Sequence, residues 1–533
     1  MRQADRIILN TLANYGLSVV QVGAALILVP TVMGQLGEGG YGVVSLVTTI
    51  WAGFSIFSNC IGRAMQRFLP LDLADPASGR LSRTFSTCVA GYFVIGFSGA
   101  LAVWFMRDWL LTDPNLTPQQ RADGRWAFAV SCAWLAIGLA GFAYQKGLEC
   151  LQRYELTGLY VGGTTVLRTL ILIAAFWFER GTVTLYVAVD LGASVVACLL
   201  CRRTMLRLMP DLKESVRLID RKAVTAIAAF AGVTLVVIVG NVLGAHGFRV
   251  LVSKRLGMDQ LAALAVVLTI TTLMWRLIND LSNVLAPAVS HLDARGDATS
   301  VGKLLVSGTK YSVAVAATMC LVPLAMAGDF FHLWVGDKFK NFQDLNTLAT
   351  VLLSAQVLLC LGATALQVLL GLGKLQLTGP IMFGRGALAL LAAFVYLQWI
   401  GSSLVTAAVC LYAVQVLGEL AIFTYACGMT RMPRLRSLAE ALLRPVALAT
   451  AGSITTWLVS KEVGTDGWWK LGVSVAAGEL VFLAIMLLAG LSREERSHLL
   501  SFAGRAWQAR AKVSGLWVRR PAEPTLQNGR KGG

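Results

Sequence analysis

The chain has 533 residues, of which 56% are hydrophobic and only 14% are charged, and its mean hydropathy is +0.67. Soluble domains carry about 25% charged residues, so this composition disfavours a soluble enzyme and predicts a surface that faces lipid. Backbone polar groups must be paired inside a bilayer, and the sequence lacks strand-type alternation. The expected fold class is therefore all-α integral membrane. The formal charge of +17 is spread over separated loops, which predicts contact with anionic membrane lipids and no nucleic-acid binding.

About fourteen stretches are long and apolar enough to span a membrane, since a spanning helix needs roughly 20 mostly apolar residues. In chain order they are 10–33, 41–61, 84–106, 126–144, 157–178, 182–201, 223–244, 259–283, 308–330, 345–370, 375–397, 402–426, 444–460 and 470–491. An even number of crossings places both termini on one side. Lys and Arg concentrate in the loops on that side, most densely between Arg202 and Lys222. Because such loops stay cytoplasmic, both termini are predicted to be cytoplasmic.

The two halves of the chain repeat one another at a shift of about 220 residues. Leu36-Gly37 aligns with Leu256-Gly257, Asn59 with Asn279, and Leu156-Thr157-Gly158 with Leu377-Thr378-Gly379. Six helices per repeat is an even number, so both copies enter the membrane in the same orientation. This pattern predicts two parallel six-helix bundles with a substrate path between them, plus two C-terminal helices.

The repeat also predicts how the chain is divided. The expected parts are an N-lobe with helices 1–6 over 1–201, a basic cytoplasmic linker over 202–222, a C-lobe with helices 7–12 over 223–430, helices 13–14 over 431–491, and a basic amphipathic, then disordered, cytoplasmic tail over 492–533.

Polar residues inside the predicted spans give the candidate site. Thr269, Thr272, Arg276, Asn279 and Asn283 are spaced by three or four residues, which places them on one helix face. An arginine at the membrane centre costs about 2.5–3.5 kcal/mol on insertion scales, so these side chains should line a cavity or a helix contact. The candidate substrate-binding residues inside the spans are Arg168, Arg385, Arg276, Asn279 and Asn59. Arg249, just beyond the outer end of the span 223–244, is a further candidate at the mouth of the cavity, with a position on the surface as the alternative.

Arg168 and Arg385 are the deepest of these arginines, and they lie at nearly matching places in the two repeats. In one interpretation the guanidinium groups bind a phosphate or an acidic sugar through charge-assisted hydrogen bonds. In the other they form ion pairs within the bundle. Asp190 and Glu419 are candidate partners for such pairs, or carriers of a coupling proton or sodium ion. No metal site and no cofactor are expected, because the four histidines lack ligand spacing.

Three stretches carry a family resemblance. Val29–Gly37 is followed by Tyr41-Gly42, Leu285–Asp297 follows the eighth span, and Leu333–Gly336 follows the ninth. Together they resemble the Wzx-like polysaccharide flippases of the multidrug/oligosaccharidyl-lipid/polysaccharide (MOP) exporter superfamily, over roughly residues 7–430. The resemblance implies two six-helix lobes, alternating access and a cationic central cavity, with Arg168, Arg276 and Arg385 as its arginines.

The resemblance also implies a substrate and partners. The substrate would be an undecaprenyl-diphosphate-linked oligosaccharide repeat unit, moved across the bacterial inner membrane for O-antigen, capsule or exopolysaccharide synthesis. A polysaccharide polymerase and export machinery would be partners, and no catalysis is expected.

Three alternatives stay open. A cation-coupled multidrug exporter would have an acidic residue on its first helix. A lipid II flippase would have arginines on that helix. Residues 10–33 contain neither an acidic residue nor an arginine. A membrane polysaccharide polymerase or ligase would carry a large outside loop, and none is expected here.

Overall fold

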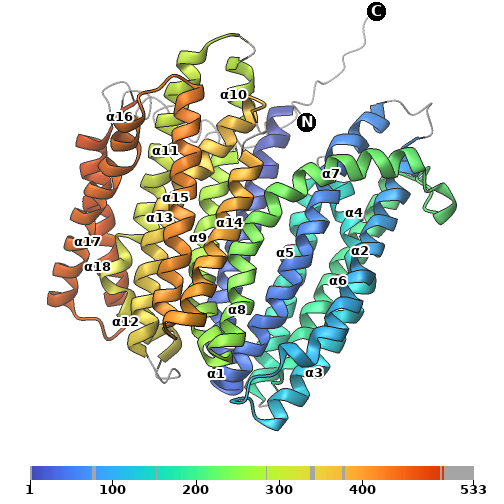
Figure 1. Cartoon of the computed structure of the whole chain (residues 1–533), viewed down its shortest axis with the longest axis horizontal. Coiled ribbons are helices and arrows are strands. Elements are labelled where there is room, and N and C mark those ends of the chain that lie inside the picture. The colour runs from blue at the N-terminus through green and yellow to red at the C-terminus, as the bar shows by residue number, and fades with distance from the viewer. Residues whose placement is uncertain are drawn as a thin grey trace, which may run out of the picture.

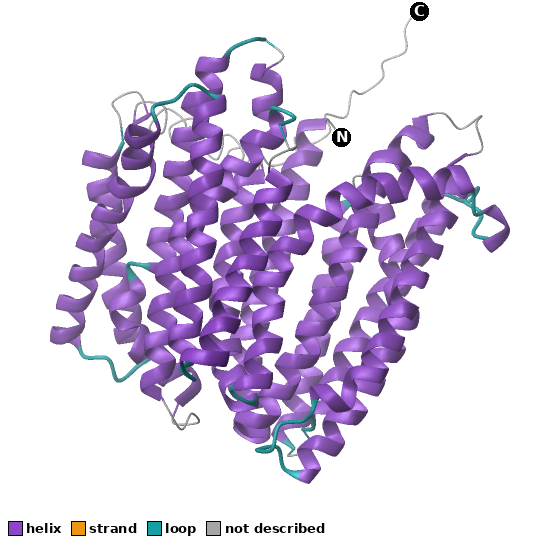
Figure 2. Ribbon diagram, viewed as in Figure 1, coloured by secondary structure: helices purple, strands orange, loops and turns teal. Residues whose placement is uncertain are grey.

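The computed structural model describes residues 3–74, 80–151, 153–178, 181–283, 285–293, 295–336, 342–374, 378–491 and 495–496. Within these ranges the chain forms helices joined by short turns, and they contain no strand (Figure 2). Twelve of the described helices are long and apolar enough to cross a membrane. The predicted all-α, multi-pass membrane fold is thus confirmed. Apart from 495–496, the predicted tail lies outside the described residues.

The first helix, α1 (Gln3–Ala74), consists of two arms joined at Gly37. Gly37 has a φ of +67° and a ψ of −178°, a conformation that glycine adopts at low cost because it has no Cβ. The two arms contain the predicted spans 10–33 and 41–61. Gly257, its partner in the sequence repeat, also has a positive φ, +92°. Both halves of the chain therefore place a left-handed glycine between their first two long helices.

The N-terminal bundle comprises the helices up to residue 208. After α1 come α2 (Arg80–Leu110), α3 (Pro118–Ala133), the π-helix η2 (Trp134–Gly138), α4 (Leu139–Cys150), α5 (Tyr154–Trp177) and α6 (Val183–Leu208). Large side chains fill its interior, among them Phe85, Tyr92, Phe128 and Phe176, each under 2% exposed. The loop between α2 and α3 ends in a capping box, in which Thr117 and Gln120 satisfy each other's backbone N–H groups.

The C-terminal bundle begins with one long helical stretch that changes its pitch partway. This stretch consists of α7 (Arg221–Val242), the π-helix η4 (Leu243–Gly247) and α8 (Phe248–Arg255). It is followed by α9 (Met258–Asn283), α10 (Leu285–Asp293), α11 (Ala298–Cys320), the 3₁₀ helix η5 (Pro323–Met326), α12 (Ala327–Val335), α13 (Phe342–Gly371), α14 (Thr378–Val395), the π-helix η7 (Tyr396–Ile400) and α15 (Leu404–Met429). The core of this bundle is built largely by α13, which packs on α9, α11 and α15.

Two further long helices follow, the first of which packs on α11 and the second on the first. They are α17 (Arg444–Val463) and α18 (Trp468–Ile485), preceded by α16 (Arg434–Leu438) and the π-helix η8 (Ala439–Leu443) and followed by the π-helix η9 (Met486–Gly490). A methyl group at Gly478 would lie 2.6 Å from the Gly452 carbonyl oxygen, so the two backbones approach closely. Small residues are typical of membrane helix contacts, because close approach maximises van der Waals packing there.

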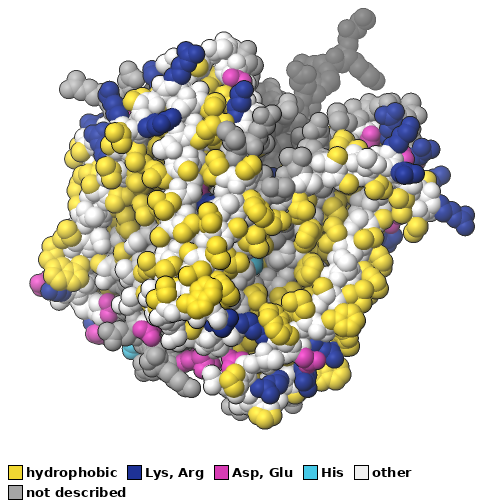
Figure 3. Space-filling view, in the orientation of Figure 1, with side chains coloured by type: hydrophobic (Ala, Val, Ile, Leu, Met, Phe, Trp, Pro, Cys, Tyr) yellow, Lys and Arg dark blue, Asp and Glu magenta, His cyan; other side chains and the backbone are white. Residues whose placement is uncertain are grey.

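The two bundles approach each other at the end of the molecule that carries α3 and α8, and they diverge toward the end at which α1 begins (Figure 1). α1 packs on α9, and α7 contacts both α1 and α14. Apolar side chains cover much of the visible outer surface (Figure 3). Among these surface groups Phe105 and Trp177 are each 80% exposed, which fits a surface in contact with lipid.

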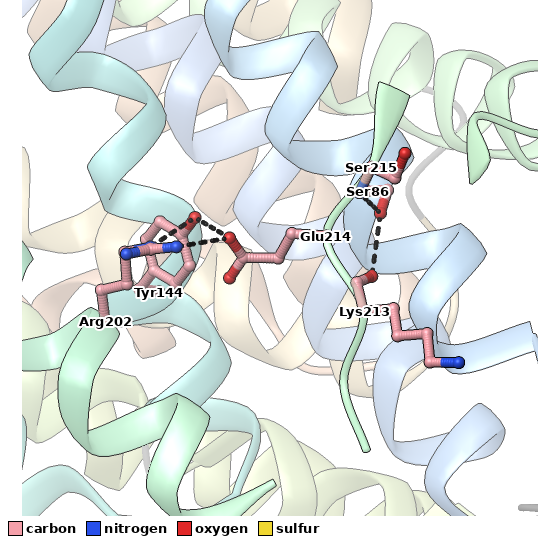
Figure 4. A network of polar contacts seen from close by, with 6 residues as sticks. All are labelled: Ser86, Tyr144, Arg202, Lys213, Glu214 and Ser215. Carbon is pink, nitrogen blue, oxygen red and sulfur yellow. Dashed lines mark hydrogen bonds and ion pairs between the residues drawn. The ribbon is translucent and has the colours of Figure 1, made fainter. Parts of the chain in front are cut away.

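The basic segment between the bundles is attached to the N-terminal bundle (Figure 4). The Ser86 hydroxyl of α2 donates to the Lys213 carbonyl and accepts from the Ser215 amide, both at 3.3 Å. Glu214 accepts hydrogen bonds from Tyr144 and Arg202, both at 3.0 Å. These contacts hold the segment before α7 against α2, α4 and α6.

Candidate substrate cavity

A cavity of about 290 Å³ lies between the two bundles. Both arms of α1, together with α5 and α6, line it on one side, and α8 and α9 line it on the other. Its polar lining consists of Tyr41, Ser45, Thr48, Arg168, Tyr186, Arg249, Thr269 and Thr272. Its remaining lining is apolar. The cavity thus offers two guanidinium groups and several hydroxyl groups within a largely apolar wall, a composition suited to a small anionic group.

Arg249 of α8 has no carboxylate partner within 4.0 Å among the residues that the structure describes. Its Nη1 lies 3.5 Å from the Thr49 hydroxyl, and its Nε is buried without a hydrogen-bond partner. A guanidinium carries five N–H donors, and a buried donor that stays unpaired costs about 1–3 kcal/mol. This arrangement suits an anion that supplies the missing acceptors.

The local fold explains why Arg249 faces the cavity. A methyl group at Gly247 would lie 2.8 Å from Leu390 of α14, so this face of the helix packs tightly on α14. The backbones of α7 and α14 are also in close contact. A methyl group at Gly386 would overlap the Gly240 carbonyl oxygen, and one at Gly240 would overlap the Met382 carbonyl oxygen. Two residues beyond Gly247, a helix has turned by about 200°, which directs Arg249 away from α14.

Arg168 of α5 forms an ion pair with Asp190 of α6 at the wall of the cavity. The two side chains are 22% and 17% exposed, and Arg168 Nε is buried without a hydrogen-bond partner. The pair therefore combines both interpretations of the sequence. Arg168 has the acidic partner of the structural interpretation, yet it also lines the space in which a ligand would bind.

Arg385 of α14 forms an ion pair with Glu419 of α15, but it is not part of the lining of this cavity. The two side chains are only 7% and 5% exposed. Gly362 of α13 makes the room for the carboxylate, since a methyl group there would overlap Glu419 Oε2. Arg168–Asp190 and Arg385–Glu419 occupy corresponding helices of the two repeats, but one pair borders a cavity and the other is enclosed by protein.

The remaining candidates lie on α1 and α9. The Arg276 guanidinium donates to the Gln21 side-chain oxygen, and this hydrogen bond joins α9 to the first arm of α1 across the bundles. Asn59 is exposed and Asn279 is partly exposed, and neither lines the 290 Å³ cavity. Arg276 and Asn279 lie on the polar stripe of α9, of which Thr269 and Thr272 line the cavity.

The sequence analysis did not identify the hydroxyl groups that the N-terminal bundle contributes to the cavity lining. Tyr41, Ser45 and Thr48 lie one turn apart on the second arm of α1. Their spacing of four and three residues is the same signal as the stripe on α9. Tyr186 of α6 also lines the cavity. It lies four residues before Asp190, one turn away on the same helix face.

At the end opposite the start of α1, a carboxylate joins the two bundles. Asp113 lies between α2 and α3, is 5% exposed, and accepts hydrogen bonds from the Met258 amide at 2.6 Å and the Asn115 amide at 2.9 Å. Met258 is the first residue of α9, where backbone N–H groups lack partners within the helix. Lys254 adds a 2.9 Å hydrogen bond to the Thr112 hydroxyl. We call these four residues, Thr112, Asp113, Lys254 and Met258, the inter-bundle latch.

Replacing Asp113 with alanine is expected to loosen the inter-bundle latch. A hydrogen bond to a charged group contributes about 1.5–3 kcal/mol, so hydrogen exchange of the Met258 amide should accelerate about 10- to 100-fold. Exchange measured by mass spectrometry on protein in lipid nanodiscs checks this. Asp108→Ala is the control, because Asp108 is 57% exposed and pairs with Arg125 on the N-terminal bundle alone. Equal exchange in wild type and Asp113→Ala would show that the bundles are held together elsewhere.

No protein-family model and no curated protein matches this chain. Among solved structures, the lipid II flippase MurJ in an inward closed conformation is similar over 90% of this chain and 98% of that chain, with a TM-score of 0.69 and 10% identity. An inward-facing multidrug resistance MATE family transporter of the MOP superfamily matches over 77% of this chain and 94% of that chain, with a TM-score of 0.61 and 12% identity. An outward-facing conformation of a multidrug resistance MATE family transporter of the MOP superfamily matches over 79% of this chain and 95% of that chain, with a TM-score of 0.53 and 13% identity. The chain therefore has the fold of these transporters.

Proposed function

We propose that this protein is a flippase of the MOP superfamily that moves an undecaprenyl-diphosphate-linked oligosaccharide repeat unit across the bacterial inner membrane, for O-antigen, capsule or exopolysaccharide synthesis. The observation that carries the proposal is Arg249, a cation without an acidic partner among the described residues, in a cavity between two bundles. The fold it shares with MurJ, a lipid II flippase, supports a lipid-linked substrate.

In the proposed mechanism the diphosphate binds Arg249 first, because that guanidinium has unused donors. It then competes with Asp190 for Arg168, so the second cation is shared between substrate and protein. The glycan occupies the space between the bundles, and the prenyl chain stays in lipid. Binding is strong enough to load the substrate and weak enough to release it, because Asp190 can reclaim Arg168.

In the proposed mechanism, energy coupling acts at Asp190. A proton or sodium ion on Asp190 would weaken its hold on Arg168 and thereby favour substrate binding. Glu419 was the other candidate for coupling, but its enclosure with Arg385 suits a structural role better. The proposed protein performs no covalent chemistry, and its termini and basic loops lie in the cytoplasm.

The cationic lining also argues against the multidrug alternative. A cavity for cationic drugs needs an acid at its wall, and Asp190 is already paired with Arg168. Phosphate and carboxylate ligands suit unpaired guanidinium groups far better.

A deletion strain tests the proposal. Loss of the gene should abolish surface polysaccharide while lipid-linked repeat units accumulate on the cytoplasmic side of the membrane. Wild-type protein should restore export, and Arg249→Gln, expressed to the same level, should not. Normal polysaccharide display in the deletion strain would rule out this function, and accumulation of lipid II would assign the chain to the other lipid-linked substrate.

A further inference from the structure

A second, larger hollow lies at the end of the molecule opposite the start of α1. It is an apolar groove of about 710 Å³ between α8 and α14, with walls that include Leu251, Leu390 and Phe394. Trp109 of α2 contributes a wall from the N-terminal bundle. Trp109 and Leu391 of this lining are 51% and 53% exposed, so the groove opens on the lipid-facing surface.

Two cations of the last turn of α8, Lys254 and Arg255, also line this groove. The Lys254 ammonium lies 4.2 Å from the centre of the Trp109 ring, and the Arg255 guanidinium lies 5.7 Å from that of Phe394. Neither has a carboxylate within 4.0 Å in the part of the chain that the structure describes. Basic side chains in dark blue lie among apolar ones in this region of the surface (Figure 3).

Lys254 and Arg255 have more N–H donors than their described hydrogen bonds use. Thr112 accepts one hydrogen bond from Lys254, whereas an ammonium has three donors and a guanidinium has five. Their stems lie against aromatic rings, and tryptophan beside basic residues is typical of the level at which a membrane meets water. The groove thus combines an apolar channel with two partly unused cations at one end.

We infer that this groove is a binding site for an anionic phospholipid. An acyl chain lies along α8 and α14, and the phosphate binds Lys254 and Arg255. The charge of the site selects a lipid with a net negative headgroup over a zwitterionic one, because two cations line the groove, and Asp113, the described carboxylate that acts on Lys254, forms no ion pair with it within 4.0 Å. This inference does not depend on the transported substrate.

The position of the groove gives the lipid a second effect. Trp109 and Thr112 belong to the N-terminal bundle, whereas Lys254 belongs to the C-terminal bundle and to the inter-bundle latch. A phosphate on Lys254 and an acyl chain against Trp109 would therefore contact both bundles. The bound lipid stabilises the closed arrangement at this end and slows hydrogen exchange of the Met258 amide.

Native mass spectrometry on the purified full-length protein tests the site, with phosphatidylglycerol and phosphatidylcholine of identical acyl chains. Wild type should bind phosphatidylglycerol about tenfold or more tightly than phosphatidylcholine. The double variant Lys254→Gln/Arg255→Gln should lose most of this preference, about 10- to 30-fold in affinity. Leu251→Trp keeps both charges but fills the groove, so it should weaken the binding of both lipids.

Lys461→Gln is the matched control. Lys461 also lies against a tryptophan, 3.7 Å from the Trp457 ring centre, and it lies in the last turn of α17, outside the groove lining. Its loss should leave the preference unchanged. Equal binding of the two lipids by wild type, a preference that survives in the double variant, or an equal loss in Lys461→Gln would each overturn the inference. Slower Met258 exchange in phosphatidylglycerol nanodiscs than in phosphatidylcholine nanodiscs, abolished in Leu251→Trp, would support it independently.

Discussion

Glu419→Gln is expected to destabilise the protein by about 3–5 kcal/mol, the usual cost of removing one partner of a buried ion pair. The substitution removes the carboxylate from an arginine whose side chain is only 7% exposed. An amide of the same shape leaves the packing around Gly362 intact, so the loss of charge is the main change. Thermal unfolding of the purified protein in detergent, followed by size-exclusion chromatography, measures the effect.

Asp190→Asn provides the comparison within the same molecule. Its pair with Arg168 is about three times as exposed and borders the cavity. Because its two side chains are partly exposed, solvent can screen this pair, so the stability loss should be smaller, about 1 kcal/mol, while transport changes. A loss of stability as large as that of Glu419→Gln would place both arginines in structural roles. An unchanged melting temperature in Glu419→Gln would remove the structural interpretation of Arg385.

The membrane fold could be predicted from the sequence because its signals are local. A span is a continuous run of apolar residues, and lipid leaves the backbone no alternative to a helix. The alignment of Gly37 with Gly257 in the sequence repeat is also a local signal. Each glycine lies in a turn between two spans and has a positive φ, which glycine tolerates.

The different surroundings of Arg168 and Arg385 could not be predicted, because they depend on a third helix. Glu419 is enclosed because α13 carries Gly362 beside it, about 57 residues earlier in the chain. No spacing within α14 or α15 reveals this contact. The two arginines therefore looked equivalent in the sequence, although only one of them lines the described cavity.

For a related reason, the sequence did not place Arg249 inside a predicted span. The expected helix ended at residue 244, whereas the structure continues through the π-helix η4 into α8. A π-turn shifts the register of every later side chain relative to a regular helix, and such turns are frequent at functional sites. Periodicity arguments that assume 3.6 residues per turn cannot place a residue beyond it.

Arg249→Gln is expected to weaken the binding of a lipid-linked diphosphate by about 30-fold or more. Truncating one partner of a buried, hydrogen-bonded charge pair costs about 2–5 kcal/mol, and each 1.36 kcal/mol corresponds to a factor of ten. Arg249→Lys should recover only part of the affinity, because an ammonium keeps the charge but lacks the planar pair of donors. Native mass spectrometry with the lipid-linked diphosphate and a flipping assay in proteoliposomes measure binding and transport separately.

The sign of the stability change decides whether Arg249 binds ligand or supports the fold. In the ligand-free protein its Nε is buried and unpaired, so removing the guanidinium should leave the melting temperature unchanged or raise it, while transport is lost. Arg125→Gln is the control for charge alone, because Arg125 is 56% exposed and pairs with Asp108 at 2.8 Å, away from the cavity. A melting temperature that falls together with transport in Arg249→Gln would mean that the guanidinium supports the fold. Loss of transport in a protein of equal or greater stability requires a ligand that supplies the missing acceptors, and a diphosphate is the one that the proposed function provides.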